Sequence, residues 1–177
     1  MLTQDLIRRL PKAELHVHLD GSVRPETLLE LAQQQNLKLP ATNVAELAHY
    51  MHVTDARNLV DYLARFEVTL SVMQTPDALE RCTYELIADG AAENVRYMEI
   101  RYSPVLNTRG GMPLTEAVEA PLRGMKRAEQ EFGVPAGSSH PVLDGPADEV
   151  PPESNELGRP SSVDKELDDP LAHMDRP

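Results

Sequence analysis

The 177-residue sequence contains no tryptophan, one cysteine and only 4% aromatic residues. A lone cysteine, Cys82, excludes an internal disulfide and is best interpreted as a small buried apolar residue. The sequence has no run of about 18 uninterrupted apolar residues, and residues 1–11 lack an apolar stretch of signal-peptide length. We therefore expect a cytoplasmic protein that makes no contact with a membrane.

Basic residues are also scarce, with 17 Lys and Arg against 29 Asp and Glu and a formal net charge of -12. No basic patch is visible, and this argues against nucleic acid as a partner, because binding to phosphates requires clustered positive charge. The length suits one ordinary domain but falls below the roughly 250 residues typical of a closed eight-stranded α/β barrel.

The sequence has two unlike parts. All seven aromatic residues precede residue 133, whereas residues 135–177 are rich in Pro, Ser, Asp and Glu. Such a segment buries too little apolar surface to offset an ordering cost of about 1 to 2 kcal/mol per residue. We predict one folded region, residues 1–134, and a disordered acidic tail, residues 135–177. A helix is expected to end at Gly133, with no strand after it.

Residues 1–134 show a pattern of alternating strands and helices. Residues 13–19 (AELHVHL) alternate with period two, and residues 95–102 (VRYMEIRY) are rich in β-forming residues, so both are predicted strands. Apolar positions three and four apart predict helices at four places, 25–36, 59–73, 77–93 and 114–132. Two strands flanked by helices indicate a parallel α/β sheet.

His16 and His18 are the first residues of the sequence that indicate a functional site. Residues i and i+2 of a strand project from the same face, so two imidazole nitrogens can reach one zinc ion at about 2.0 to 2.1 Å. Taken alone, the pair is better explained as two histidines on the polar face of a strand. Asp20 follows at the carboxyl end of this strand, where barrel enzymes hold their catalytic groups. Glu99 and Arg101 share one face of the second strand and suggest a buried ion pair.

The string LPKAELHVHLDGSVRPETL, residues 10–28, closely resembles the opening of the adenosine deaminases. The resemblance continues in the helix that carries Leu59, Tyr62, Leu63 and Phe66, and in YMEIRYSP, residues 97–104, which looks like the second barrel strand of that family. It covers residues 6–134. The fold it implies is α/β, an incomplete TIM-type (β/α) barrel that contains the first two barrel strands and their flanking helices.

The resemblance implies a zinc-dependent hydrolytic deamination of adenosine or deoxyadenosine to inosine or deoxyinosine, with one zinc ion. His16 and His18 match the first two zinc ligands of the family. Asp20 matches a residue that contacts the ribose, and His18 lies close enough to help form the same pocket. The acidic residue after His-x-His-Leu favours adenosine over adenine or AMP as substrate. The helix of residues 59–66 resembles a lid over the substrate, although a role as plain core explains it equally well.

The resemblance also implies residues that have no matching motif here. In the family a glutamate acid, a third histidine ligand, a further histidine that does not bind the metal directly and two aspartates come from later strands. His140 and His173 lie in the predicted tail, and His49 and His52 are best explained as a polar helix end or loop. With two ligands, any zinc affinity should be weak.

We therefore expect a truncated family member that is inactive alone and associates through exposed barrel edges. Two alternatives stay open. One is a non-enzymatic binding or regulatory protein built on a barrel fragment, which would be folded and soluble without deaminase activity. The other is a different metal-dependent hydrolase with a His-x-His strand.

Overall fold

The computed structural model describes residues 3–52 and 59–139, apart from the side chains of residues 59–64 and of residue 139. The chain divides into two units, Met1–Val142 and Leu143–Pro177, and every described residue belongs to the first. The predicted tail therefore lies outside the described residues, except for its first five positions. Among the described residues, no helix is both long enough and apolar enough to cross a membrane.

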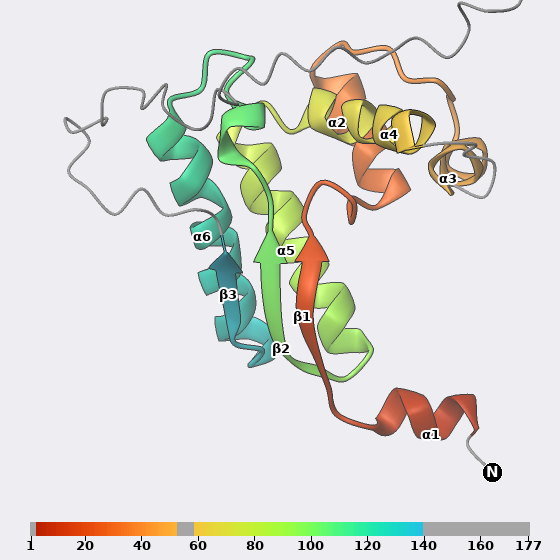
Figure 1. Cartoon of the computed structure of the whole chain (residues 1–177), viewed down its shortest axis with the longest axis vertical. Helices are drawn as coiled ribbons and strands as arrows, with labels where there is room; N and C mark the ends of the chain where they lie inside the picture. Colours follow the sequence, from red (N-terminus) through yellow and green to blue (C-terminus); the bar gives the residue numbers. More distant parts are fainter. Residues whose placement is uncertain (1–2, 53–58, 140–177) are drawn as a thin grey trace, which may run out of the picture. The chain divides into compact units, whose positions relative to one another are not determined.

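A three-stranded parallel sheet forms the centre of this unit, in the order β1-β2-β3 (Figure 1). The strands are β1 (Lys12–His18), β2 (Val95–Arg101) and β3 (Ala136–Ser139). In the register of the sheet, His18 pairs with Arg101, which in turn pairs with Ser139. All three carboxyl ends therefore meet at one edge of the sheet, beside the loops that follow β1 and β2.

Helices connect the strands. After a short α1 (Gln4–Arg9), the chain passes through β1 and then α2 (Pro25–Gln34), α3 (Val44–Met51), α4 (Leu59–Val72) and α5 (Pro76–Ala92) before β2. The 3-10 helix η1 (Pro104–Asn107) and α6 (Leu114–Phe132) lead on to β3. Helices α5 and α6 lie against one face of the sheet, whereas α2, α3 and α4 gather near the carboxyl ends of the strands (Figure 1).

The hydrophobic core lies between the sheet and the helices α5 and α6. Met98 and Ile100 point from β2 into this core, where they meet Leu79 and Ile87 of α5, and all four side chains are almost fully buried. Helix α6 approaches α5 so closely at Gly124 that a Cβ atom there would stand 2.4 Å from the carbonyl oxygen of Glu80. The α5–α6 layer therefore depends on the missing side chain at this position.

The boundaries of the helices follow local rules. Thr75 caps α5 by accepting a hydrogen bond from the Ala78 amide, and Pro76 occupies the first turn. Helix α6 ends at Gly133, which has a left-handed backbone with φ of 66°. Gly90 of α5 packs closely against β2, since a Cβ atom there would come within 2.5 Å of the terminal methyl group of Met98 and 3.5 Å of the Val95 Cβ.

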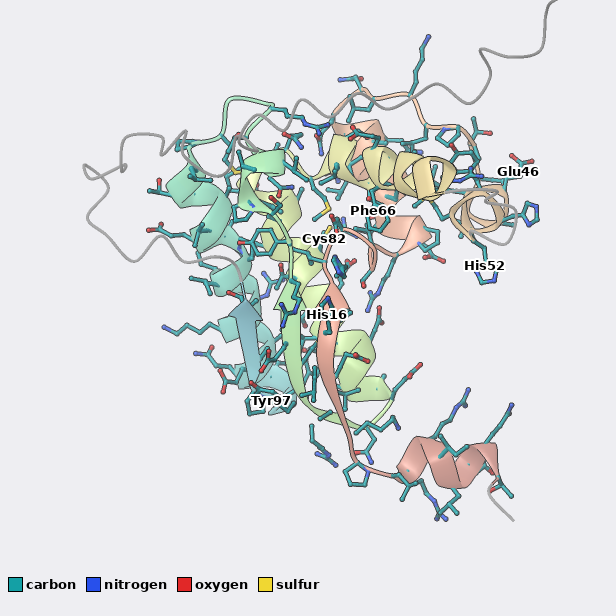
Figure 2. All side chains as sticks on the ribbon, viewed as in Figure 1. His16, Glu46, His52, Phe66, Cys82 and Tyr97 are labelled. Atoms are coloured by element: carbon teal, nitrogen blue, oxygen red, sulfur yellow. The ribbon has the colours of Figure 1, made fainter. Side chains whose placement is uncertain are left out.

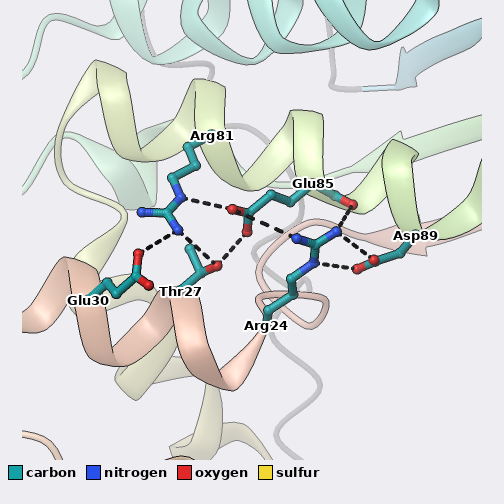
Figure 3. A network of polar contacts seen from close by, with 6 residues as sticks. All are labelled: Arg24, Thr27, Glu30, Arg81, Glu85 and Asp89. Atoms are coloured by element: carbon teal, nitrogen blue, oxygen red, sulfur yellow. Dashed lines mark hydrogen bonds and ion pairs between the residues drawn. The ribbon is translucent and has the colours of Figure 1, made fainter. Parts of the chain in front are cut away.

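A polar network joins α2 to α5 (Figure 3). Arg24, at the start of α2, donates to both carboxylate oxygens of Asp89 at 2.6 and 2.9 Å. Arg81 of α5 donates to Glu85 at 2.8 Å and to Glu30 at 2.7 Å. Thr27, which is almost fully buried, donates to Glu85 at 2.5 Å. The network fixes the first turn of α2, and with it the end of the loop that leaves β1.

Most predicted elements are confirmed, and the α/β class with parallel strands and flanking helices is as expected. Both predicted strands and all four predicted helices are present within one or two residues of the expected bounds. The prediction that no strand follows residue 134 is wrong, because Ala136–Ser139 pairs in parallel with β2. The helices α1 and α3 were not predicted either, since each is short, with 6 and 8 residues.

Candidate active site

Two imidazole rings converge on the face of the sheet opposite α5 and α6. The Nε2 atoms of His16 and His18 lie 3.2 Å apart, and the ring centroids are 5.2 Å apart. Both residues are exposed, and Figure 2 shows His16 on β1 near the carboxyl end of the strand. The period of two along the strand thus places both rings together, as predicted.

This spacing fits a metal ion. Two nitrogens bound at about 2.0 to 2.1 Å to one tetrahedral zinc stand about 3.3 to 3.4 Å apart, and the observed Nε2 separation of 3.2 Å is close to that value. Two neutral imidazoles can therefore hold zinc through their Nε2 atoms with little rearrangement. No group of three or more His, Cys, Asp or Glu able to hold a metal occurs among residues 3–52 and 59–139.

A tight turn after β1 places Asp20 beside the histidines. The Ser22 hydroxyl donates to the carbonyl of His18 at 2.6 Å, and the Leu19 amide donates to the carbonyl of Arg101 at 2.9 Å. These bonds tie the turn to both β1 and β2. Oδ1 of Asp20 lies 3.7 Å from Nδ1 of His18, so the carboxylate faces the ring nitrogen that is not directed at His16.

Asp20 is the most unusual carboxylate of the described part of the chain. Burial raises its pKa above the ordinary aspartate value, opposed by the charge of His18 and by backbone hydrogen bonds from residues 20 and 21. Its Oδ1 is buried and accepts no hydrogen bond. A buried carboxylate oxygen without a donor is costly unless a ligand supplies one, such as a hydroxyl group. The atom is therefore suited to contact a bound molecule.

A hollow of about 720 Å³ opens over these groups. His16, His18 and Asp20 line one side of it, and apolar side chains from α4 and η1 line the other, namely Phe66, Leu70 and Leu106. Figure 2 shows Phe66 on α4, and a Cβ at Gly21 would touch its ring edge at 3.4 Å. A polar floor with an apolar wall is typical of sites for flat, partly apolar ligands.

Hydrogen bonds between the end of α4 and the loop after β2 hold the apolar wall in place. Gln74, just after α4, donates to the Leu106 carbonyl at 3.1 Å and accepts from the Gly110 amide at 3.1 Å. The buried Asn107 amide donates to the carbonyl of Met73 at 2.9 Å. These bonds fix the loop after β2 against the end of α4. Sequence patterns did not reveal this clamp, because its two sides are more than 30 residues apart.

The predicted ion pair of Glu99 and Arg101 is wrong. Glu99 instead accepts a hydrogen bond from the Tyr97 hydroxyl at 3.0 Å, and the buried Nε of Arg101 has no hydrogen-bond partner. Neighbours on one face of a strand are about 7 Å apart along the chain, too far for a direct contact unless both side chains lean together. Here Glu99 leans toward Tyr97.

The remaining histidines lie elsewhere. His49 is in the last turn of α3 and His52 caps that helix, so of the two predicted alternatives, a polar helix end or a loop, the structure has the helix end. Both line a separate pocket of about 330 Å³ with Tyr50 and Arg65, whose guanidinium stacks on the Tyr50 ring at 3.9 Å. His140 and His173 lie outside the described residues. The site that the described residues build thus rests on His16, His18 and Asp20.

Comparison with known proteins shows which proteins share this fold. The solved structures it matches include an amidohydrolase from Burkholderia ambifaria with bound Zn, at 32% identity and a TM-score of 0.62, over 78% of this chain and 38% of that one. They also include an adenine deaminase from Arthrobacter aurescens, at 29% identity and a TM-score of 0.63, over 71% of this chain and 38% of that one. The described residues therefore form part of a TIM-type barrel, the fold of these structural neighbours.

Comparison of the sequence identifies the family within this fold. The adenosine deaminase family model matches residues 11–144. A curated adenosine deaminase from Vibrio atlanticus is 45% identical over 125 residues, which are 71% of this chain and 38% of that protein. The chain belongs to the adenosine deaminase family. It spans about two fifths of the length of such relatives.

Proposed function

We propose that the histidine face of β1 is part of a zinc-dependent site for the hydrolytic deamination of adenosine or deoxyadenosine. The observation that carries this proposal is the 3.2 Å separation of the His16 and His18 Nε2 atoms, beside the buried Asp20 carboxylate. Family membership and a zinc-containing structural neighbour support the choice of metal and reaction.

Each residue has a distinct proposed role. His16 and His18 would hold zinc, which when bound supplies an activated water for attack on the purine carbon that carries the amine. Asp20 would accept a hydrogen bond from a ribose hydroxyl, since its Oδ1 is buried without a donor. The His18 ring, between the metal position and Asp20, would contact the same nucleoside. Free adenine has no ribose, and so it would leave Asp20 without a partner.

The apolar wall has a complementary role. A purine ring presents two flat, largely apolar faces, and Phe66, Leu70 and Leu106 offer an apolar surface on the far side of the hollow. The ring would lie against this wall while the ribose points toward Asp20. This arrangement predicts a preference for nucleosides over free bases through Asp20, and for purines over smaller rings through the wall.

The 177-residue chain alone is proposed to be inactive. Deamination also requires an acid that protonates the purine ring nitrogen and a base that orients the water. The described residues place no third metal-ligating group beside His16 and His18. We propose that these groups must be supplied by further barrel strands.

The test is a complementation assay. The chain is mixed with zinc, adenosine and the part of the Vibrio atlanticus relative that lies beyond its matched region, and the loss of adenosine absorbance is followed. We expect turnover in the mixture, none from either piece alone, and none when the chain carries His16→Ala. The relative's own matching segment is the positive control. If that control restores activity and this chain does not, the proposed function is wrong.

A further inference from the structure

The apolar wall of the hollow is built from two separate segments of the chain. Phe66 and Leu70 come from α4, whereas Leu106 comes from η1, in the loop after β2. Side chains on two such segments keep a fixed spacing only if other contacts join the segments. Hydrogen bonds join them here, and the half-buried side chain of Gln74 makes bonds to both segments.

Gln74 bonds to both leucines of the wall at once. Its Nε2 donates to the Leu70 carbonyl at 2.7 Å and to the Leu106 carbonyl at 3.1 Å. Its Oε1 accepts from the Gly110 amide at 3.1 Å. Both N–H groups and the oxygen of this side-chain amide are therefore in use. A single side chain thus ties the backbone of Leu70 to the backbone of Leu106.

We propose that Gln74 is a positioning residue that determines the size of the ring bound in the hollow, because it fixes the spacing of Leu70 and Leu106. The inference rests on the proposed nucleoside site and deepens it. A purine has two fused rings and can lie across both leucines, whereas the single ring of a pyrimidine buries less apolar surface against them. Since the free energy of apolar contact increases with the area buried, a wall with a fixed spacing favours the purine.

Close packing keeps Gln74 in this position. Gly110 has no side chain, and a Cβ atom there would lie 3.1 Å from the Cβ of Gln74 and 3.2 Å from its carbonyl oxygen. The loop after β2 therefore approaches the end of α4 closely enough for the Gly110 amide to reach the Gln74 side chain. The buried Asn107 adds a bond between the same segments, but its acceptor is the carbonyl of Met73, which is not part of the wall.

The ion pair of Arg109 and Glu67 also joins the loop to α4, with distances of 2.6 and 3.3 Å. Both side chains are at least half exposed, and solvent screens an exposed pair strongly. This pair should therefore have less influence on the spacing of the wall than the half-buried amide of Gln74.

Gln35 provides a matched control. Its Nε2 donates to the Val72 carbonyl at 2.8 Å, so it too holds the end of α4 through a glutamine amide. It reaches α4 from the end of α2, and its acceptor is not a residue of the wall. Loss of either glutamine should lower stability to a similar extent, whereas only the loss of Gln74 should change ring selection.

Nucleoside binding to the full chain, in the presence of zinc, tests the proposal. The chain contains no tryptophan, so the fluorescence of 2-aminopurine riboside can be followed as this purine nucleoside binds. Adenosine and cytidine then compete for the site, since both carry a ribose and an amine but differ in ring size. We expect adenosine to bind about tenfold more tightly than cytidine, because its larger ring buries more apolar surface.

Substitutions at the join should weaken this preference. Gln74→Ala and Gln74→Met both remove the hydrogen bonds, while Met keeps much of the side-chain volume, and we expect the preference to fall to about threefold or less. Gly110→Ala should act in the same direction, because the added methyl group displaces Gln74. Gln35→Ala should keep the preference of the unaltered chain. Circular dichroism checks that each variant is folded.

The possible outcomes separate this inference from the proposed function. An unchanged preference in Gln74→Ala or Gln74→Met, or an equal fall in Gln35→Ala, would overturn the role of Gln74 and leave the nucleoside site standing. Equal binding of adenosine and cytidine by the unaltered chain would do the same. Failure of the unaltered chain to bind 2-aminopurine riboside would overturn the inference and the proposed nucleoside site together.

Discussion

The two faces of the small sheet differ in almost every property. The face toward α5 and α6 carries Met98 and Ile100, which are 2% and 0% exposed, and its contacts are apolar. The opposite face carries His16, His18 and Glu99, and the first two are exposed. One face therefore supplies stability and the other holds the histidines of the proposed zinc site. Substitutions on the two faces should accordingly change different measurements.

The largest effect on stability is expected from Ile100→Ala. The side chain is fully buried among α5 and α6 residues, and truncation of a buried aliphatic side chain to alanine typically costs about 2 to 5 kcal/mol. Urea denaturation of the full chain measures the loss. His16→Ala, on the opposite face of the sheet, should change the free energy of unfolding by less than about 0.5 kcal/mol. Equal losses would contradict the division between the faces.

Gly124→Ala tests the layer behind the covered face. The added methyl group would lie 2.4 Å from the Glu80 carbonyl oxygen and 3.0 Å from the Thr83 Cβ, so α6 must move away from α5. Overpacking of this kind typically costs about 1 to 3 kcal/mol. Leu122→Ala is the control, because Leu122 lies on the same helix and is 44% exposed. A stabilising Gly124→Ala would show that the two helices are less closely packed than described.

The contribution of an ion pair to stability should also increase with the burial of its side chains. Arg81→Ala removes a donor from Glu85, whose side chain is only 12% exposed, and we expect a loss of about 1 to 2 kcal/mol. Arg109→Ala breaks the pair with Glu67, in which both side chains are at least half exposed, and should cost about 0 to 1 kcal/mol. Thermal unfolding of both variants measures the two losses. A larger loss for Arg109→Ala than for Arg81→Ala would contradict this dependence on burial.

Substitution of Cys82 is expected to change the pH dependence of stability, and this is the smallest of the expected effects at neutral pH. Burial raises the pKa of its thiol to about 12 from 9.0, so the folded chain keeps the proton over a range in which the unfolded chain loses it. Its contribution to stability is full below pH 9 and is lost as the pH rises toward about 12. The decline in stability over this range should be smaller in Cys82→Ala. Alkylation of the native thiol at pH 8 should also be slow, and fast alkylation would show an accessible thiolate.

The predictions from sequence succeeded where a short local rule decided the structure. The alternation of residues 13–19 placed His16 and His18 on one face, and the structure brings their Nε2 atoms to 3.2 Å. Gly133 ended α6 as expected, because a left-handed residue closes a helix. These outcomes depend on the backbone period and on single residues.

Where partners far along the chain decided the structure, prediction failed. Residues Ala136–Ser139 have low β-propensity and no apolar alternation, and they form β3 only because β2 offers an open edge. The pairing of Glu99 with Tyr97 rather than Arg101 depends on how side chains lean on the sheet. The clamp of Gln74 on Leu106 and Gly110 joins segments with no shared local pattern. Such contacts require tertiary structure.

The central claim is that His16 and His18 are the zinc ligands of this chain, and histidine side-chain NMR during a zinc titration tests it most directly. The account predicts that the ring signals of His16 and His18 change first and together, with Nε2 as the bound atom, while those of His49 and His52 stay unchanged. Changes that begin at His49, His52, His140 or His173, with the β1 histidines unaffected, would contradict it.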